Sequence, residues 1–146
     1  MTAELRQVFD DLVRFETALW NGIDARLRAA GAVPLGSLNV LQVVARTSPC
    51  RVNEVADALA ITIGGASQAV DRLVARELLA RRPNPGDRRS SIVELTGAGS
   101  DALAAAEAVF DAELARWFEG ALTGSALRSF ARTLSALRAF SGGQHD

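Results

Sequence analysis

Six arginines concentrate positive charge between residues 62 and 91, where only three acidic residues oppose them, although the whole chain has a formal net charge of −1. They occupy positions 72, 76, 81, 82, 88 and 89. The last four lie on either side of the turn-forming sequence Asn84-Pro85-Gly86-Asp87. A guanidinium group suits bidentate contacts to phosphate and to guanine, so this placement is typical of a surface that binds nucleic acid.

Other reactive side chains are sparse. The chain has no lysine and no tyrosine, and its one histidine, His145, lies in a tail, residues 141–146, that we expect to fray. A single cysteine, Cys50, excludes an intrachain disulfide and a cysteine-based metal cluster within one chain. There are no paired carboxylates, phosphate-binding glycine loop or metal-ligand spacing. We therefore expect that the protein is not an enzyme and has no catalytic residue, cofactor or metal.

The arginines require a particular set of elements to position them. Alternation and turn residues predict a hairpin with strands over 79–83 and 91–95. Before it, a helix is expected over 63–77, capped by Thr62, with Ala66, Val70, Leu73 and Val74 on its buried stripe. A short helix over 54–60, with Asn53 as its N-cap, precedes that one. Two helices joined by a tight turn and followed by a hairpin are typical of a winged helix-turn-helix.

Long helices flank this region on both sides. Apolar residues at three- and four-residue steps predict a helix over 3–30, stopped by Gly31, and a second over 35–46. Thr96 is expected to cap a helix over 97–120, and Thr123 to cap the last helix. The predicted fold is mostly α with a small β-hairpin wing. With no apolar run long enough for a membrane helix and no signal-peptide pattern at the N-terminus, we expect a cytoplasmic protein with no membrane partner.

Three segments at matching spacing resemble the MarR (multiple-antibiotic-resistance regulator) family of bacterial transcription factors. Residues 53–59 look like the first helix of its helix-turn-helix, and residues 67–74 look like its recognition helix. Asp87-Arg88-Arg89 followed by Leu95-Thr96 looks like the wing signature of that family. The family often has glycine just after the recognition helix, whereas this chain has Arg76-Glu77-Leu78-Leu79. The resemblance implies one MarR-like chain with a DNA-binding lobe over 35–96 and dimerisation helices over 1–30 and 97–141.

The resemblance also implies roles in binding double-stranded DNA. Polar residues on the exposed face of the 63–77 helix, Ser67, Gln68 and Arg72, are expected to read bases in the major groove. Asp71 is expected to orient Arg72 or its neighbours instead of touching DNA. In the wing, Arg89 is expected to enter the minor groove, Asp87 to brace the wing by pairing with an arginine, and three arginines to contact phosphates. Those three are Arg81, Arg82 and Arg88.

A homodimer is expected, because one winged helix covers too few base pairs for a selective operator and two can read a palindrome. The interface candidates are Leu5, Phe9, Phe118, Leu127, Phe130 and Leu134, although some of these could belong to an intrachain core. Members of the family are commonly released from DNA by small aromatic ligands. Arg14, Phe15 and Trp20 are candidates to line such a site, with a plain core role as the alternative. Cys50 is expected to be a buried structural thiol and not an oxidant sensor.

The resulting prediction is a sequence-specific regulator of transcription, most simply a repressor. The alternative is a winged helix that binds a protein instead of DNA, because the fold alone does not decide between the two. Operator sequence, effector and target genes do not follow from the sequence.

Overall fold

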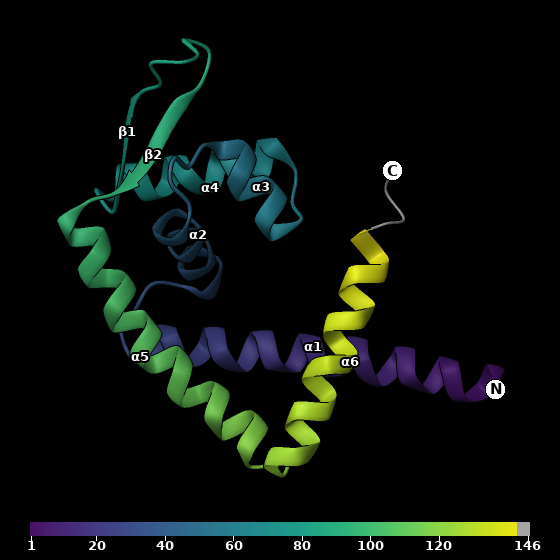
Figure 1. The fold of residues 1–146 in the computed structure, drawn as a ribbon. Coiled ribbons are helices and arrows are strands. Elements are labelled where there is room, and N and C mark those ends of the chain that lie inside the picture. The colour runs from purple at the N-terminus through teal and green to yellow at the C-terminus, as the bar shows by residue number, and fades with distance from the viewer. Residues whose placement is uncertain (143–146) are drawn as a thin grey trace. The chain divides into compact units, whose positions relative to one another are not determined.

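The computed structural model describes residues 1–142, which form six helices and one two-stranded antiparallel sheet (Figure 1). The elements, in chain order, are α1 (Thr2–Ala29), α2 (Leu35–Arg46), α3 (Val52–Leu59), α4 (Ile63–Ala75), β1 (Leu79–Pro83), β2 (Ser91–Leu95), α5 (Gly97–Glu119) and α6 (Gly124–Gly142). The predicted fold class is confirmed, and both strands have the predicted bounds. The described residues divide into two compact units, one of residues 1–110 and one that begins at Asp111.

The end of α1 is set by Gly31, as predicted. Gly31 has φ of +71°, its N–H donates to the Arg28 carbonyl, and the N–H of Ala32 donates to the carbonyl of Leu27. This pair of bonds is a Schellman motif, in which glycine adopts the left-handed conformation without steric cost. The carboxylate of Asp24 then accepts the N–H of Leu35 at 2.9 Å, which fixes the start of α2 to α1.

The hydrophobic core of the first unit lies among α2, α3, α4 and the base of the hairpin. Leu38, Leu41, Val55, Val70 and Leu73 are each at most 1% exposed. They lie on one face of each helix, as amphipathic periodicity requires. The N–H of Val93 donates to the Cys50 carbonyl at 2.8 Å, so the loop before α3 is hydrogen-bonded to β2. Together these contacts hold α4 and the hairpin against the same hydrophobic core.

The helix limits differ from the sequence prediction by two residues at three places and by one residue at the other ends that differ. Helix α3 begins at Val52 with Arg51 as its N-cap, not Asn53, because the Glu54 carboxylate accepts the Arg51 backbone N–H at 2.9 Å. Helix α4 ends at Ala75 and not at Glu77. Helix α6 continues through residues 141 and 142, which were expected to fray. The rest of the expected tail, with His145, lies outside the described residues.

The junction after α4 uses a left-handed residue that is not glycine. Glu77 has φ of +60°, and its N–H donates to the Val74 carbonyl while that of Leu78 donates to Leu73. A Schellman motif therefore forms without glycine, against the steric preference of a residue that carries Cβ. The hydroxyl of Thr96 donates to the Glu77 carbonyl at 2.6 Å and accepts the N–H of Gly99 at 2.9 Å. Thr96 thus caps α5, as predicted, and ties it to the junction.

The second unit comprises the end of α5 and all of α6. Glu113 is 6% exposed and accepts hydrogen bonds from the guanidinium of Arg116 and, at 3.1 Å, from the indole of Trp117. The rings of Phe118 and Phe130 lie 6.4 Å apart, centroid to centroid. Thr123 accepts the N–H of Ala126 at 3.3 Å and begins α6, as predicted. Four interface candidates, Phe118, Leu127, Phe130 and Leu134, are half-buried within this unit.

Candidate DNA-binding surface

Helix α4 presents a polar face to solvent. Thr62 caps it by accepting the N–H of Gly65 at 3.0 Å, as predicted. Gln68 and Arg72 are exposed and Ser67 is half-buried, while Ala66, Val70 and Leu73 bury the opposite stripe. The three residues expected to contact bases therefore lie on the outer side of a helix whose inner side is fixed by packing. A helix so presented has the dimensions to enter a major groove.

Arg81, expected to contact phosphate, instead pairs with side chains of α4 and β2. One terminal nitrogen lies 2.7 Å from Oδ1 of Asp71 on α4, and the other donates to Oγ of Ser91 on β2 at 3.0 Å. Asp71 therefore pairs with Arg81, a neighbour in space and not in sequence.

Arg82 is also paired, on the other face of the hairpin. Its Nε lies 2.5 Å from Oε1 of Glu94, and both side chains are about half exposed. Exposed cross-strand pairs of this kind contribute only about 0–1 kcal/mol to stability. Glu94 nevertheless offsets part of the positive charge that the sequence assigned to the base of the wing.

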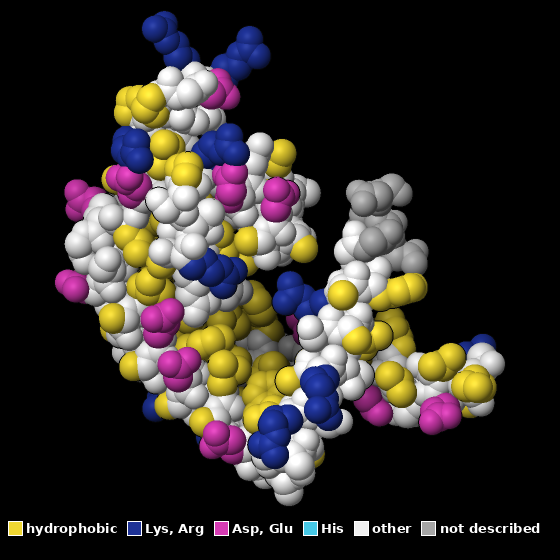
Figure 2. All heavy atoms as spheres, in the orientation of Figure 1, with side chains coloured by type: hydrophobic (Ala, Val, Ile, Leu, Met, Phe, Trp, Pro, Cys, Tyr) yellow, Lys and Arg dark blue, Asp and Glu magenta, His cyan; other side chains and the backbone are white. Residues whose placement is uncertain are grey.

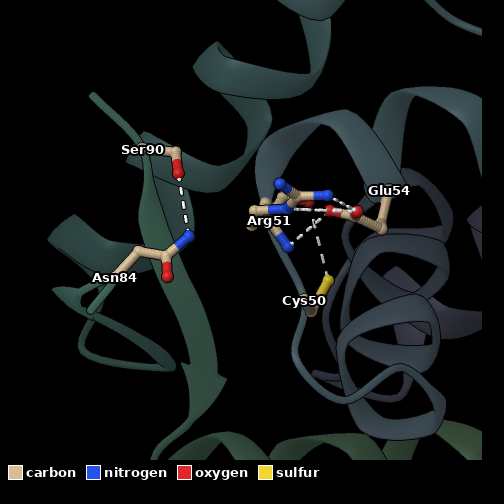
Figure 3. Close-up of polar contacts among 5 residues, drawn as sticks. All are labelled: Cys50, Arg51, Glu54, Asn84 and Ser90. Carbon is tan, nitrogen blue, oxygen red and sulfur yellow. Dashed lines mark hydrogen bonds and ion pairs between the residues drawn. The ribbon is translucent and has the colours of Figure 1, made fainter. Parts of the chain in front are cut away.

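The loop at the tip of the wing is shaped by short polar side chains. Asn84 Nδ2 donates to Ser90 Oγ at 3.0 Å across the loop (Figure 3), and Asn84 Oδ1 accepts the Gly86 N–H at 3.0 Å. Asp87 accepts the backbone N–H of Arg89 at 2.9 Å. This carboxylate contact holds the backbone at Arg89, whereas the ion pair with an arginine expected of Asp87 does not form within residues 1–142.

Arg88 and Arg89 remain exposed at the tip, and neither makes an ion pair within residues 1–142. Figure 2 shows basic side chains protruding from the end of the hairpin. Arg72 and Arg76 on and after α4 are likewise exposed and without an ion pair in the described chain. Of the six arginines between residues 62 and 91, four are thus available to an anionic partner.

Arg51 is a seventh arginine near the wing, and no role was predicted for it from the sequence because it lies outside residues 62–91. Arg51 Nη2 lies 2.5 Å from Glu54 Oε1 at the start of α3 (Figure 3). Hydrogen bonding to Glu54 raises the pKa of Arg51, with a smaller contribution from the charge of Asp87. The same Arg51 hydrogen bond lowers the pKa of Glu54. The spacing Arg51-x-x-Glu54 could have indicated this pair, because a glutamate three residues after the N-cap often accepts the N-cap backbone N–H. Asn53 was predicted as the N-cap instead, because asparagine is a common N-cap residue.

A hollow of about 690 Å³ lies between α1, α2 and α4. Its wall carries Trp20, the basic side chains of Arg28 and Arg72, and the carboxylate of Asp24, which pairs with Arg28 at 2.8 Å; apolar Val40 and Ile61 also line it. Of the three residues expected to bind a ligand, only Trp20 lines it. Arg14 pairs with Asp10 at 2.7 Å on the exposed side of α1, and Phe15 is half-buried.

Cys50 is buried, as expected. The residue is 1% exposed, and burial raises the pKa of its thiol. A smaller hollow of about 240 Å³ beside it is lined by the 44–50 segment and by β2. A raised thiol pKa leaves little thiolate at neutral pH, which is the form that reacts with oxidants.

Within residues 1–142, no cluster of three or more His, Cys, Asp or Glu side chains is placed to hold a metal ion. None of the described helices has the length and apolar character needed to cross a membrane.

Comparison with known protein families gives a match over the helix-turn-helix and the wing loop. Residues 33–90 match the model of the MarR family, which covers α2 through the wing loop. No curated protein sequence matches the chain.

Solved structures of MarR-family regulators share the fold over most of the chain. Sco3205 from Streptomyces coelicolor, solved in complex with DNA, has a TM-score of 0.87 at 23% identity, covering 100% of this chain and 91% of its own. A mutant MarR from E. coli complexed with operator DNA has a TM-score of 0.83 at 19% identity, covering 92% and 95%. CouR from Rhodococcus jostii RHA1, bound to p-coumaroyl-CoA, has a TM-score of 0.75 at 24% identity, covering 86% and 87%. The family model thus supports the resemblance inferred from the sequence over residues 33–90, and the solved structures show the same fold over most of the chain.

Proposed function

We propose that this chain, which has the fold of the MarR family of transcriptional regulators and matches its model over residues 33–90, binds double-stranded DNA sequence-specifically as a homodimer. Occupying a palindromic operator in this way would make it a repressor of the adjoining gene. Two relatives in fold were solved with DNA, which supports the same partner here.

The observation that carries the proposal is the distribution of unpaired arginines. Arg72 projects from the polar face of α4, and Arg88 and Arg89 project from the tip of the wing. A helix in the major groove would place Arg72 against the base edges, and a wing over the adjacent minor groove would place Arg88 and Arg89 beside phosphates and in the negative potential of that groove. Gln68, beside them on α4, can pair with adenine, as Arg can with guanine.

The dimer is supported by apolar surface that the single chain leaves exposed. On the N-terminal part of α1, Leu5, Phe9 and Leu12 are between 43% and 69% exposed, and Figure 2 shows hydrophobic side chains there. In α6, Leu137 and Phe140 are 54% and 69% exposed. Monomeric proteins rarely expose apolar groups in such rows. Covering them with a second copy would supply the two recognition helices, roughly 34 Å apart, that a palindrome requires.

Release by a small ligand is supported by the hollow beside α4. Arg72 lines this hollow and also belongs to the proposed DNA-reading face. An aromatic anion stacked on Trp20 would attract the guanidinium group of Arg72, because Arg28 is already paired with Asp24 in the same hollow, and would thereby compete with DNA for Arg72. If so, benzoate added in increasing amounts should weaken DNA binding by the wild type. A Trp20→Ala variant should need more benzoate for the same effect, and equal sensitivity would argue against this hollow.

The experiment that tests DNA binding compares two arginines of the wing. On a duplex enriched by selection from a random pool, Arg89→Ala should weaken binding by at least tenfold, because its partner is the DNA. The matched control, Arg82→Ala, removes the same charge from a side chain already paired with Glu94 and should have a much smaller effect. Gel filtration should show the dimer retained in both. Unchanged binding by a dimeric Arg89→Ala protein would refute the role of the wing.

A winged helix that binds a protein remains the alternative function. Binding driven by phosphate contacts weakens steeply as salt rises, with a slope set by the number of contacts. Failure to enrich any duplex at low salt would favour the protein-binding alternative.

A further inference from the structure

The guanidinium group of Arg81 joins the three elements of the candidate DNA-binding surface. It donates from Nη2 to Asp71 on α4 at 2.7 Å and from Nη1 to Ser91 on β2 at 3.0 Å, while its own backbone belongs to β1. Its side chain is 31% exposed, and that of Asp71 is 63% exposed. The recognition helix and both strands of the wing are therefore connected through one planar group outside the apolar core.

The strand register explains why Arg81 reaches α4 and Arg82 does not. Arg81 lies opposite Val93, on the face of the hairpin that also carries buried Leu79. Side chains alternate between faces along a strand, so Arg82 points to the other face, where it meets Glu94. Two adjacent arginines with the same charge thus have different structural partners, which makes Arg82 a natural control.

We propose that Arg81 is a positioning residue, and that the Asp71–Arg81–Ser91 bridge sets the angle between the recognition helix and the wing. This assignment replaces the phosphate contact expected for Arg81 from sequence, and it rests on the proposed DNA-binding function. The bridge also neutralises Asp71, a carboxylate that would otherwise stand on the DNA-facing side of α4 and repel phosphate. Arg81 contributes to affinity through these two effects and not through contact with DNA.

The test is a double-mutant cycle read by operator affinity. Arg81→Gln breaks the bridge and frees the Asp71 carboxylate, so we expect binding to weaken at least tenfold. Adding Asp71→Asn removes the freed carboxylate, so Asp71→Asn/Arg81→Gln should bind at least threefold more tightly than Arg81→Gln alone. Asp71→Asn alone completes the cycle, and it should not tighten binding by the wild type. A phosphate ligand lost from position 81 would leave the effect of Asp71→Asn the same in both backgrounds, so rescue confined to Arg81→Gln separates the two roles.

Two further variants keep the test independent of misfolding. Arg81→Lys retains the positive charge but lacks the planar fork that holds Asp71 and Ser91 together. We expect it to weaken binding at least fivefold, and to reduce the preference for operator over a scrambled duplex. The pairing of Arg82 with Glu94 on the other face of the hairpin replaces the phosphate contact expected for it from the sequence, so Arg82→Gln should change affinity less than threefold. Melting temperature and dimer state, measured for each variant, identify any protein that has lost its fold.

The salt dependence gives a second readout. Because Arg81 holds no phosphate, the slope of log affinity against log salt should be nearly the same in wild type and in Asp71→Asn/Arg81→Gln, which loses one positive and one negative charge. A folded Arg81→Gln protein that is not rescued by Asp71→Asn, with a slope shallower by about 0.9, would establish a direct phosphate contact and overturn the proposal. Failure of the wild type itself to bind any selected duplex would instead refute the proposed function.

Discussion

Gly99, at the start of α5, is the position where a single methyl group should do the most damage. A Cβ added there would lie 1.9 Å from the carbonyl oxygen of Leu78 and 3.3 Å from a methyl of Leu95. Real Cβ atoms do not approach closer than 3.0 Å, so the helix and this carbonyl would have to separate by about 1 Å. The same carbonyl accepts the Thr96 N–H at 3.2 Å, so the movement would strain the hydrogen bond that joins α5 to the end of α4.

The expected cost of Gly99→Ala is about 3 kcal/mol. Overpacking a well-filled site typically costs 1–3 kcal/mol, and the upper end applies because the opposing atom is backbone. For a chain of this size, that cost lowers the melting temperature by roughly 6–12 °C, at about 2–4 °C per kcal/mol. Thermal unfolding followed by circular dichroism at fixed protein concentration measures it.

Gly97→Ala is the matched control, because its Cβ would meet nothing within 4 Å. Gly97 lies two residues earlier in the same helix, where alanine is favoured over glycine by up to about 1 kcal/mol. Its melting temperature should therefore stay the same or rise. Equal melting temperatures for Gly99→Ala and Gly97→Ala would refute the close packing of α5 on Leu78.

Three further predictions concern the junction, the interhelical carboxylate and the thiol. Glu77→Gly should raise stability by about 0.5–1 kcal/mol relative to Glu77→Ala in urea unfolding, because only glycine escapes the cost of φ at +60°; no difference would argue against that conformation. Hydrogen bonding to Arg28 lowers the pKa of Asp24 from 3.8 in the folded state, so its stabilising contribution is complete well above pH 4 and is lost as pH falls below it. Asp24→Asn should accordingly lower the urea midpoint more at pH 7 than at pH 3, and an equal loss at both pH values would contradict this. Cys50 should react slowly with a maleimide until urea unfolds the protein, and rapid stoichiometric labelling of the native chain would show that the thiol is accessible.

The hairpin and the helices were predictable because their signals are local. Asn84-Pro85-Gly86-Asp87 specifies a turn, and the alternation on either side specifies strands whose observed bounds match the prediction. The caps at Thr62, Thr96 and Thr123 were predictable for the same reason, since each hydroxyl accepts an N–H three residues later.

The contacts that the sequence did not reveal are of two kinds. Some join side chains that are distant in the chain, and others depend on which of two neighbouring residues caps or ends a helix. Arg81 and Asp71 are ten residues apart on different elements, so their contact follows only from the packing of the hairpin on α4. The start of α3 was placed two residues late because the Glu54 carboxylate, and not Asn53, provides the capping contact. Positive φ at Glu77 shows that packing of Leu78 and Leu79 outweighs a local preference for glycine.

Selection of bound duplexes from a random pool, with the enriched site retested across a salt series, tests the central claim most directly. We expect an enriched palindrome whose half-site centres are about one helical turn apart, bound more tightly as salt falls. Enrichment of a single half-site would contradict the dimeric arrangement. A pool that remains unenriched at low salt would contradict DNA binding by this surface.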